Sequence, residues 1–305
     1  MASMDLKIGI IFLLQIVIGI LGNFSLLYRY MFIYVRGCRP RSMDLMLKHL
    51  TVANSLVILS KGIPQVMIAF GLKYLIDYFG CKIFLYVHRV ARGVSIGTTC
   101  LLSIFQLITI NPRNSRWAEI KVKAPKYIGP SSILCWVLHM LVNIIFPIYG
   151  MGKLRNTNIT KRKDLGYCLT PLHDRVIDSI YSVLTSFHDI LCLSLMVWAS
   201  SAMVFILYRH KQQVRHIHRS NFSPRSSPET RATQSILVLV GTFVSFYAFS
   251  SIIYVYSAVF DNSSWWVVNA ATLITACFPT ISPFVLMNRD PSISRFCCIC
   301  HGRNT

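Results

Sequence analysis

The sequence predicts an all-α membrane protein, built as a bundle of seven membrane-spanning helices. The chain is 54% hydrophobic and only 14% charged, whereas an average soluble domain is about 25% charged. Apolar segments close to the roughly 20 residues that a bilayer requires recur seven times. Basic residues gather in alternate connections between these segments. We expect residues 1–305 to form a single domain.

The seven expected spans cover, in chain order, about residues 8–30, 47–70, 83–108, 128–148, 180–207, 233–257 and 266–287. The first is expected to stay in the mature protein, because its apolar run is too long for a signal-peptide core and no A-x-A site follows it. The second contains Pro64, which is expected to kink its helix. The fifth is longer than a bilayer requires. The seventh begins with Trp265 and Trp266, which are typical of the membrane interface.

The distribution of Lys and Arg predicts the orientation of the bundle. The connections after the first, third and fifth spans, together with the C-terminal tail, hold about twice as many of these residues as the opposite side. The cytoplasmic loops of membrane proteins carry such an excess of positive charge. The N-terminus is therefore expected outside and the C-terminus in the cytoplasm.

The formal net charge of +20 could suggest a nucleic-acid partner. Basic residues beside spanning helices more often set the topology and contact anionic lipid. We therefore expect a multi-pass protein of the plasma membrane, with membrane lipid and not nucleic acid as a partner. The ten cysteines do not form the two CxxC pairs of a zinc site, so no metal is expected. Those within spans are expected to be small apolar filler, namely Cys100, Cys135, Cys192 and Cys277.

Catalytic motifs are missing from the sequence. There is no HExxH pair and no glycine loop that could hold a phosphate. The span 266–287 contains no lysine that could bind retinal as a Schiff base. The sequence therefore predicts a protein that is not an enzyme and that needs no cofactor.

A stripe of polar residues crosses the third span. Its members are three or four residues apart, which places them on one face of a helix: Arg89, Arg92, Ser95, Thr99, Ser103 and Gln106. Charged residues inside a span are costly and mark functional sites. Helix packing is the alternative for the hydroxyl residues, and we expect it for the deeper Ser103 and Gln106.

The charged residues within spans all fall in the outer half of the expected bundle, as a ligand cavity open to the exterior would require. Asp189 is the only acid within a span, and it could pair with Arg92 or with Lys61. Snorkelling toward the interface is the alternative for Lys61 and Arg89. Because pockets combine apolar walls with a few polar groups, the candidate ligand-binding residues are Lys61, Arg89, Arg92, Ser95, Asp189 and Tyr254.

Two features of the expected outer side concern covalent modification. Cys81 and Cys168 are the only cysteines in outer loops, where conditions are oxidising, so we expect them to form a disulfide bond. Asn158 begins an Asn-Ile-Thr sequon in the loop 149–179 and is the candidate glycosylation site.

The expected cytoplasmic side is basic. The loops 111–127 and 208–232 could serve only as topology signals, or they could dock an intracellular partner. The candidate contacts for such a partner are Arg113, Arg116, Lys121, Arg209 and Lys211. Cys297 and Cys298 follow the last span and are palmitoylation candidates.

Several blocks resemble the vomeronasal type-1 receptors, a family of G-protein-coupled receptors. They are HRVARGVSIGTTC at 88–100, SRWAE at 115–119, KAPK at 123–126, LSKGIPQ at 59–65, FPTISPF at 278–284 and GYC at 166–168. The chain departs from ordinary rhodopsin-like receptors in ways that fit this family. Ile110-Asn111-Pro112 replaces a DRY triplet, and the NPxxY and CWxP motifs are missing. Asn54 occupies the place of an aspartate, which puts a sodium site in doubt.

The resemblance implies a chemosensory receptor of sensory neurons that binds a pheromone-like small molecule and activates an inhibitory-type heterotrimeric G protein. A bitter-taste-type receptor is the nearest alternative, since it also has seven short-looped helices without the usual motifs. A seven-helix transporter or channel is the alternative from another class. It would place charges through the full depth of the membrane, whereas here they stop in the outer half.

Overall fold

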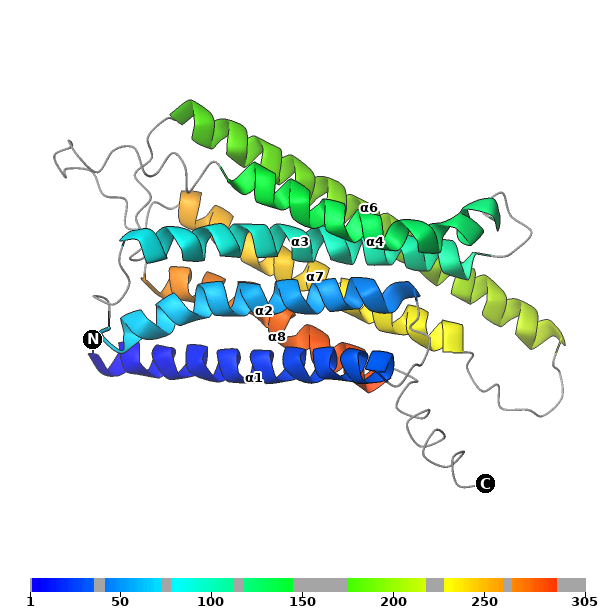
Figure 1. The fold of residues 1–305 in the computed structure, drawn as a ribbon, viewed down its shortest axis with the longest axis horizontal. Coiled ribbons are helices and arrows are strands. Elements are labelled where there is room, and N and C mark those ends of the chain that lie inside the picture. The colour runs from blue at the N-terminus through cyan, green and yellow to red at the C-terminus, as the bar shows by residue number, and fades with distance from the viewer. Residues whose placement is uncertain are drawn as a thin grey trace, which may run out of the picture.

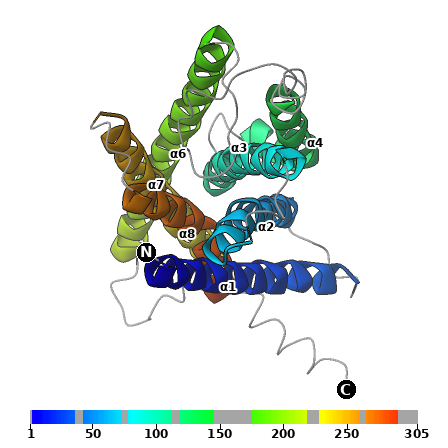
Figure 2. The ribbon, with the colours of Figure 1, turned by 90° about the vertical axis from the view of Figure 1, so that its left-hand side faces the viewer.

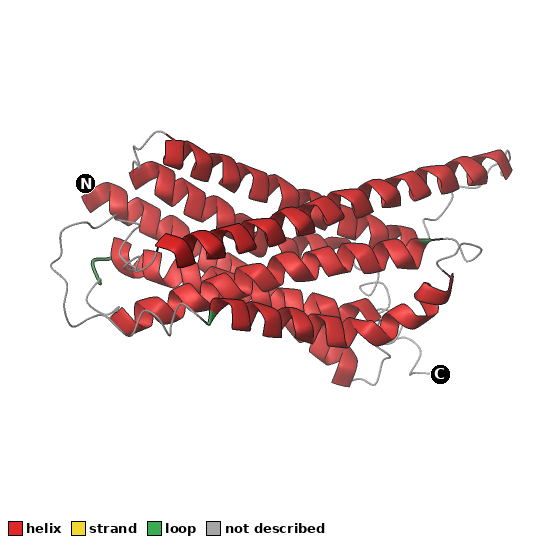
Figure 3. Cartoon of the chain, turned by 90° about the horizontal axis from the view of Figure 1, so that it is seen from above, coloured by secondary structure: helices red, strands yellow, loops and turns green. Residues whose placement is uncertain are grey.

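The computed structural model is entirely helical in the part of the chain that it describes, which comprises residues 2–35, 42–72, 78–111, 118–144, 175–217, 228–259 and 265–289. These residues form seven helices that run side by side along one long axis (Figures 1 and 3). They are α1 (Ala2–Val35), α2 (Ser42–Ala69), α3 (Tyr78–Ile110), α4 (Ala118–Asn143), α6 (Arg175–Ile217), α7 (Pro228–Val259) and α8 (Trp265–Arg289). The predicted fold class, a seven-helix bundle, is confirmed.

Six of these helices are long and apolar enough to cross a membrane. The seventh described helix, α4, does not meet both criteria of length and apolar composition. The start of α4 explains this difference. The helix begins at Ala118, ten residues before the expected span, and its first turns carry Lys121, Lys123 and Lys126. The expected span 128–148 also continues past Ile144, where the described residues end.

The third helix occupies the centre of the bundle. It packs against α2, α4, α6 and α7, and Figure 2 shows it enclosed by its neighbours. In its most apolar stretch 72% of the residues are buried, compared with 22% in α6. Because α3 has little surface left for lipid, its polar stripe faces other helices and the bundle interior, as the sequence predicted.

The apolar core lies along α3, between the remaining helices. Leu102, Met196 and Leu239 are fully buried there and come from α3, α6 and α7. Phe278 of α8 packs edge-to-face on Phe243 of α7, with 4.7 Å between the ring centroids. Burial of large apolar side chains from several helices holds the bundle together around α3.

Buried polar side chains tie the helices together at separate points. The hydroxyl of Ser95 on α3 donates to Oδ1 of Asn54 on α2 over 2.7 Å, and Nδ2 of Asn54 donates to the hydroxyl of Ser282 on α8 over 2.8 Å. Nε2 of Gln106 on α3 donates to the hydroxyl of Thr233 on α7 over 2.8 Å. Gln106 is thus a packing residue, as expected, and Ser103 only donates to the Thr99 carbonyl of its own helix.

Candidate ligand-binding cavity

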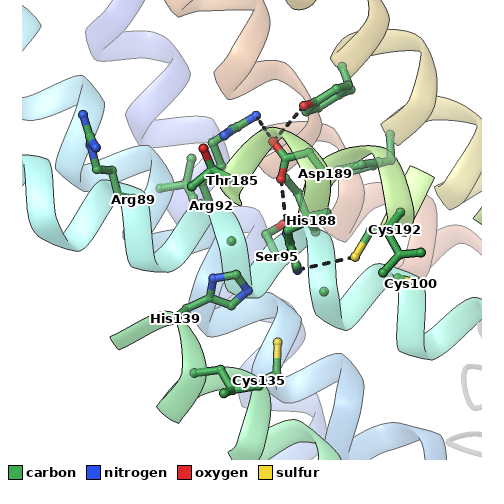
Figure 4. A pocket seen from close by; sticks show the side chains of 18 of the residues that line it. Arg89, Arg92, Ser95, Cys100, Cys135, His139, Thr185, His188, Asp189 and Cys192 are labelled. Carbon is green, nitrogen blue, oxygen red and sulfur yellow. Dashed lines mark hydrogen bonds and ion pairs between the residues drawn. The ribbon is translucent and has the colours of Figure 1, made fainter. Parts of the chain in front are cut away.

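A cavity of about 850 Å³ lies beside α3, with walls from α3, α4, α6 and α7. Thr275, Phe278 and Pro279 of α8 and Val57 of α2 complete its lining. The lining is largely apolar, and a few polar side chains converge on it (Figure 4). A mostly apolar cavity of this size with few polar groups is typical of a site for a small organic molecule.

One carboxylate organises the polar wall of the cavity. Oδ2 of Asp189 on α6 lies 3.0 Å from a guanidinium nitrogen of Arg92 on α3. The same oxygen accepts a hydrogen bond of 2.8 Å from the hydroxyl of Tyr247 on α7. The guanidinium also stands over the Tyr247 ring, 5.4 Å from its centroid. Asp189 therefore links three helices at one point.

The two partners of this ion pair differ in exposure. The Asp189 side chain is buried, whereas 39% of the Arg92 side chain remains exposed. Arg92 lines the cavity, so a bound molecule can reach its guanidinium. Of the two partners that the sequence left open for Asp189, the structure selects Arg92. A buried carboxylate that is paired and hydrogen-bonded avoids most of the cost of burying a charge.

The other oxygen of Asp189 leads to a chain of polar atoms along α6. Nδ1 of His188 lies 3.3 Å from Oδ1 of Asp189. Nε2 of His188 lies 3.5 Å from the sulfur of Cys192, one helical turn further on. The His188 ring also meets the His139 ring of α4 edge-to-face, at 4.8 Å between centroids. Figure 4 shows these side chains on adjoining walls of the cavity.

The approach of α4 to α3 depends on two glycines of the cavity wall. A Cβ atom on Gly93 would overlap the His139 ring, and one on Gly97 would lie 2.7 Å from the sulfur of Cys135. Neither side chain could be accommodated without moving α4 or its residues. These glycines keep His139 and Cys135 in contact with the cavity.

Gly93→Ala is expected to destabilise the protein by about 1 to 3 kcal/mol, the usual effect of overpacking a close contact. Gly241→Ala is the matched control, since nothing lies within 4 Å of a Cβ placed on this helical glycine, and alanine should there favour the helix. The measurement is the fraction of monodisperse, detergent-solubilised protein that survives heating. Equal melting temperatures for the two variants would contradict the close packing of α3 on α4.

Part of the cavity lining on α4 and α6 is exposed and apolar. In the described part of the chain these two helices make no close backbone contact, although both line the cavity. Leu138 of α4 and Phe187 of α6 stand on this side with 50% and 65% of their surface exposed. Exposed apolar side chains of this kind are suited to contact with lipid hydrocarbon and not with water.

The structure brings four of the six candidate ligand residues to the cavity: Arg89, Arg92, Ser95 and Asp189. The Ser95 hydroxyl is already bonded to Asn54, which favours its role in packing. Lys61 is half-buried on α2 and is not part of the lining. Tyr254 belongs to α7, but its side chain lies outside the described residues. Tyr247, two turns earlier on α7, supplies the aromatic hydroxyl.

Other predicted sites fall largely outside the described residues, namely Arg113, Arg116, Asn158, Cys168, Cys297, Cys298 and the side chain of Lys211. Cys81 is disulfide-bonded, and the other four described cysteines are free, so its partner also lies outside them. The pairing with Cys168 stays a prediction. Arg209 is exposed on α6, and Nζ of Lys121 donates to the Asn111 carbonyl over 3.3 Å.

Sequence reasoning missed several cavity residues. His139 carried no recognisable signal, because an isolated histidine in an apolar span is not distinguished by spacing. Cys100, Cys135 and Cys192, expected to be apolar filler, all belong to the cavity lining. The clue available in the sequence was the pair His188-Asp189 followed by Cys192, which puts an imidazole and a thiol on one helix face.

The fold and the cavity define the class of the protein as a seven-helix bundle with an internal cavity. Its structure matches that of squid rhodopsin with a TM-score of 0.70 at 14% sequence identity, over 96% of this chain and 79% of that one. The match shows that the chain has the fold of a G-protein-coupled receptor.

The family follows from the sequence comparisons. The model of the vomeronasal organ pheromone receptor family matches residues 6–299. The chain is 70% identical to vomeronasal type-1 receptor 2 of Homo sapiens, over 96% of its own length and 74% of that protein. It is 56% identical to human vomeronasal type-1 receptor 4, over 97% of this chain and 98% of that protein. The chain therefore belongs to the vomeronasal type-1 receptor family.

More distant similarity extends beyond mammals. The chain is 30% identical to olfactory receptor class A-like protein 1 of Danio rerio, over 92% of its own length and 89% of that protein. Family and fold together make the chain a chemosensory G-protein-coupled receptor, a multi-pass protein of the plasma membrane and not an enzyme. Family membership decides against the bitter-taste and transporter alternatives.

Proposed function

We propose that this receptor binds a pheromone-like small molecule in the cavity beside α3 and activates an inhibitory-type G protein. The observation that carries the proposal is the convergence of Arg92, Tyr247 and Asp189 on an otherwise apolar cavity of about 850 Å³. The apolar walls favour a hydrophobic molecule. The guanidinium of Arg92 favours one that also presents an acceptor oxygen, such as a carbonyl or hydroxyl group.

The mechanism we propose is a shift between two arrangements of the helices. Asp189 ties α6 to α3 through Arg92 and to α7 through Tyr247. A ligand oxygen that binds the exposed guanidinium competes with the carboxylate for it. A ligand that binds more tightly to the arrangement in which the Arg92–Asp189 contact is altered would increase the population of that arrangement. A ligand can drive the change only through such a difference in affinity between the two arrangements.

The G protein would contact the basic end of the bundle. In this proposal the N-terminus is outside and the C-terminus is in the cytoplasm, so that the basic residues Lys121, Arg209 and Lys211 face the G protein, together with Arg113 and Arg116. On the opposite side Cys81 would pair with Cys168, and Asn158 would carry a glycan. Cys297 and Cys298 would be palmitoylated. Peptide mapping by mass spectrometry of protein from the cell surface tests these modifications.

Agonists should come from a screen of volatile and steroid compounds with a calcium readout in cells that express the chain. For an agonist with an acceptor oxygen, Arg92→Ala is expected to lower the potency about tenfold or more, since that factor corresponds to about 1.4 kcal/mol of lost binding. Lys61→Ala is the matched control, because this second intramembrane cation does not line the cavity.

Nucleotide exchange on purified G proteins completes the experiment. Agonist-dependent exchange is expected with an inhibitory-type α subunit and not with a stimulatory one. The binding site is wrong if Arg92→Ala leaves both surface expression and potency unchanged. The coupling is wrong if only the stimulatory subunit responds.

A further inference from the structure

The wall of the cavity formed by α6 carries a thiol next to an imidazole that is itself bonded to a carboxylate. We propose that Cys192 is a nucleophilic thiol that binds α,β-unsaturated aldehydes and ketones covalently, with His188 as the base. This inference deepens the proposed function, because it rests on a cavity that admits small molecules. It adds the chemical class of the ligand and the atom to which that ligand is bonded.

The order of the three groups fixes the proton positions. An ionised carboxylate only accepts hydrogen bonds, so the contact of 3.3 Å between His188 Nδ1 and Asp189 Oδ1 requires the proton on Nδ1. The neutral ring then carries a lone pair on Nε2, which lies 3.5 Å from the Cys192 sulfur. A nucleophile beside a base that a third group orients is the arrangement of an activated thiol.

The contact with His188 separates the Cys192 thiol from the other described cysteines. Cys100, Cys135 and Cys192 all line the cavity. Among the described cysteines, Cys192 alone has a hydrogen bond with a histidine ring nitrogen. Cys135 lies one helical turn from His139 on α4, without such a bond. It is therefore a natural internal control, in the same cavity and with a similar neighbour.

The polar wall also offers a place for the carbonyl group of the electrophile. Asp189 uses Oδ1 for His188 and Oδ2 for Arg92 and Tyr247. The guanidinium of Arg92 is a donor that lines the same cavity as the thiol (Figure 4). A donor to the carbonyl oxygen withdraws electrons from the conjugated double bond, which makes its β carbon more electrophilic.

The reaction balances without an oxidant or a reductant. The thiol proton passes to Nε2 of His188, and a sulfur lone pair forms a bond to the β carbon. The π electrons of the carbon–carbon double bond move to the α carbon, which then takes the proton from Nε2. One S–C bond and one C–H bond form, while the S–H bond and the π bond break. The imidazole returns to its initial state.

The probe is 2-hexenal, applied to the full-length receptor in lipid nanodiscs. Borohydride then reduces the aldehyde and makes the adduct permanent for peptide mapping by mass spectrometry. Cys192 is expected to be modified at least tenfold faster than Cys100 and Cys135. Hexanal has the same length but no double bond, and it should leave no adduct on any of the three thiols.

His188→Gln tests the role of the base, because glutamine keeps a hydrogen-bonding side chain but cannot take the proton. It is expected to slow the modification of Cys192 at least tenfold, whereas His49→Gln on α2, at a histidine that does not line the cavity, should change it less than twofold. Equal rates at Cys192 and Cys135, or an unchanged rate in His188→Gln, would overturn the inference. Adducts are read by mass, so failure here with intact agonist-dependent nucleotide exchange would leave the proposed function standing.

Discussion

Asp189→Ala is expected to lower the stability of the receptor more than any other single substitution in the cavity. Removing one member of a buried ion pair typically destabilises a protein by about 3 to 5 kcal/mol, because it leaves an uncompensated charge. Here it leaves the guanidinium of Arg92 among apolar side chains and removes the acceptor of the Tyr247 hydroxyl. We expect the lower end of that range, since 39% of the Arg92 side chain is exposed and solvent screens its charge.

The measurement combines surface expression with the melting temperature of purified receptor, which should fall by about 6 °C or more. The double variant Arg92→Ala with Asp189→Ala removes both charges and is expected to be more stable than Asp189→Ala alone. Lys123→Ala is the control, because it breaks a shorter pair of 2.6 Å with Glu119 whose side chains are 59% and 79% exposed, and such pairs contribute little. Losses in the double variant that equal the sum of the two single losses would show that the two charges do not interact.

The fold could be predicted from the sequence because it depends on a repeated signal. Each apolar segment of bilayer length must form a helix, since its backbone polar groups have no other partners in hydrocarbon. The ends of the helices could be predicted less well. The fifth described helix, α6, extends from Arg175 to Ile217, well past the expected span 180–207, because residues beyond the membrane can continue a helix that has already formed.

The candidate site was predicted in part, and the missing part has a physical reason. Helical spacing shows which residues of one helix share a face, so Arg89, Arg92 and Ser95 were placed together. Spacing does not show which residue of another helix stands opposite, because this depends on how the helices are rotated and shifted. For this reason the sequence left Asp189 with two partners, and it included Lys61, which the structure places outside the cavity lining.

The tyrosines of α7 and the intramembrane thiols show the same limit. Tyr247 and Tyr254 are seven residues apart and so share a helix face, and the structure shows that the hydroxyl of Tyr247 donates to Asp189. Cysteine is a common apolar filler in helices, and its spacing is the same whether it fills space or faces a cavity. The contact of its sulfur with Nε2 of His188 distinguishes Cys192 from the other described cysteines.

Asn54→Leu is expected to have the second large effect, because it removes the junction between α2, α3 and α8. Asn54 is fully buried, and both polar atoms of its amide are used: Oδ1 accepts from Ser95, and Nδ2 donates to Ser282. Leucine fills a similar volume but leaves the two hydroxyls without this partner. A buried polar group that loses its partner destabilises a protein by about 1 to 3 kcal/mol, so we expect a total loss of about 2 to 4 kcal/mol.

Two further variants separate the junction from a general effect of substitution on α2. Ser55→Ala, at the next position, removes a hydroxyl that only donates to the Thr51 carbonyl of its own helix, and its melting temperature should match that of the parent. Asn54→Asp keeps an acceptor for Ser95, and Ser282 can rotate to donate to the new carboxyl group, so it should lie between the parent and Asn54→Leu. A melting temperature for Asn54→Leu equal to that of Ser55→Ala would show that the junction contributes nothing to stability.

Because hydroxyls already occupy both amide atoms, the parent receptor needs no cation at this position, and its melting temperature should not depend on replacing sodium by potassium.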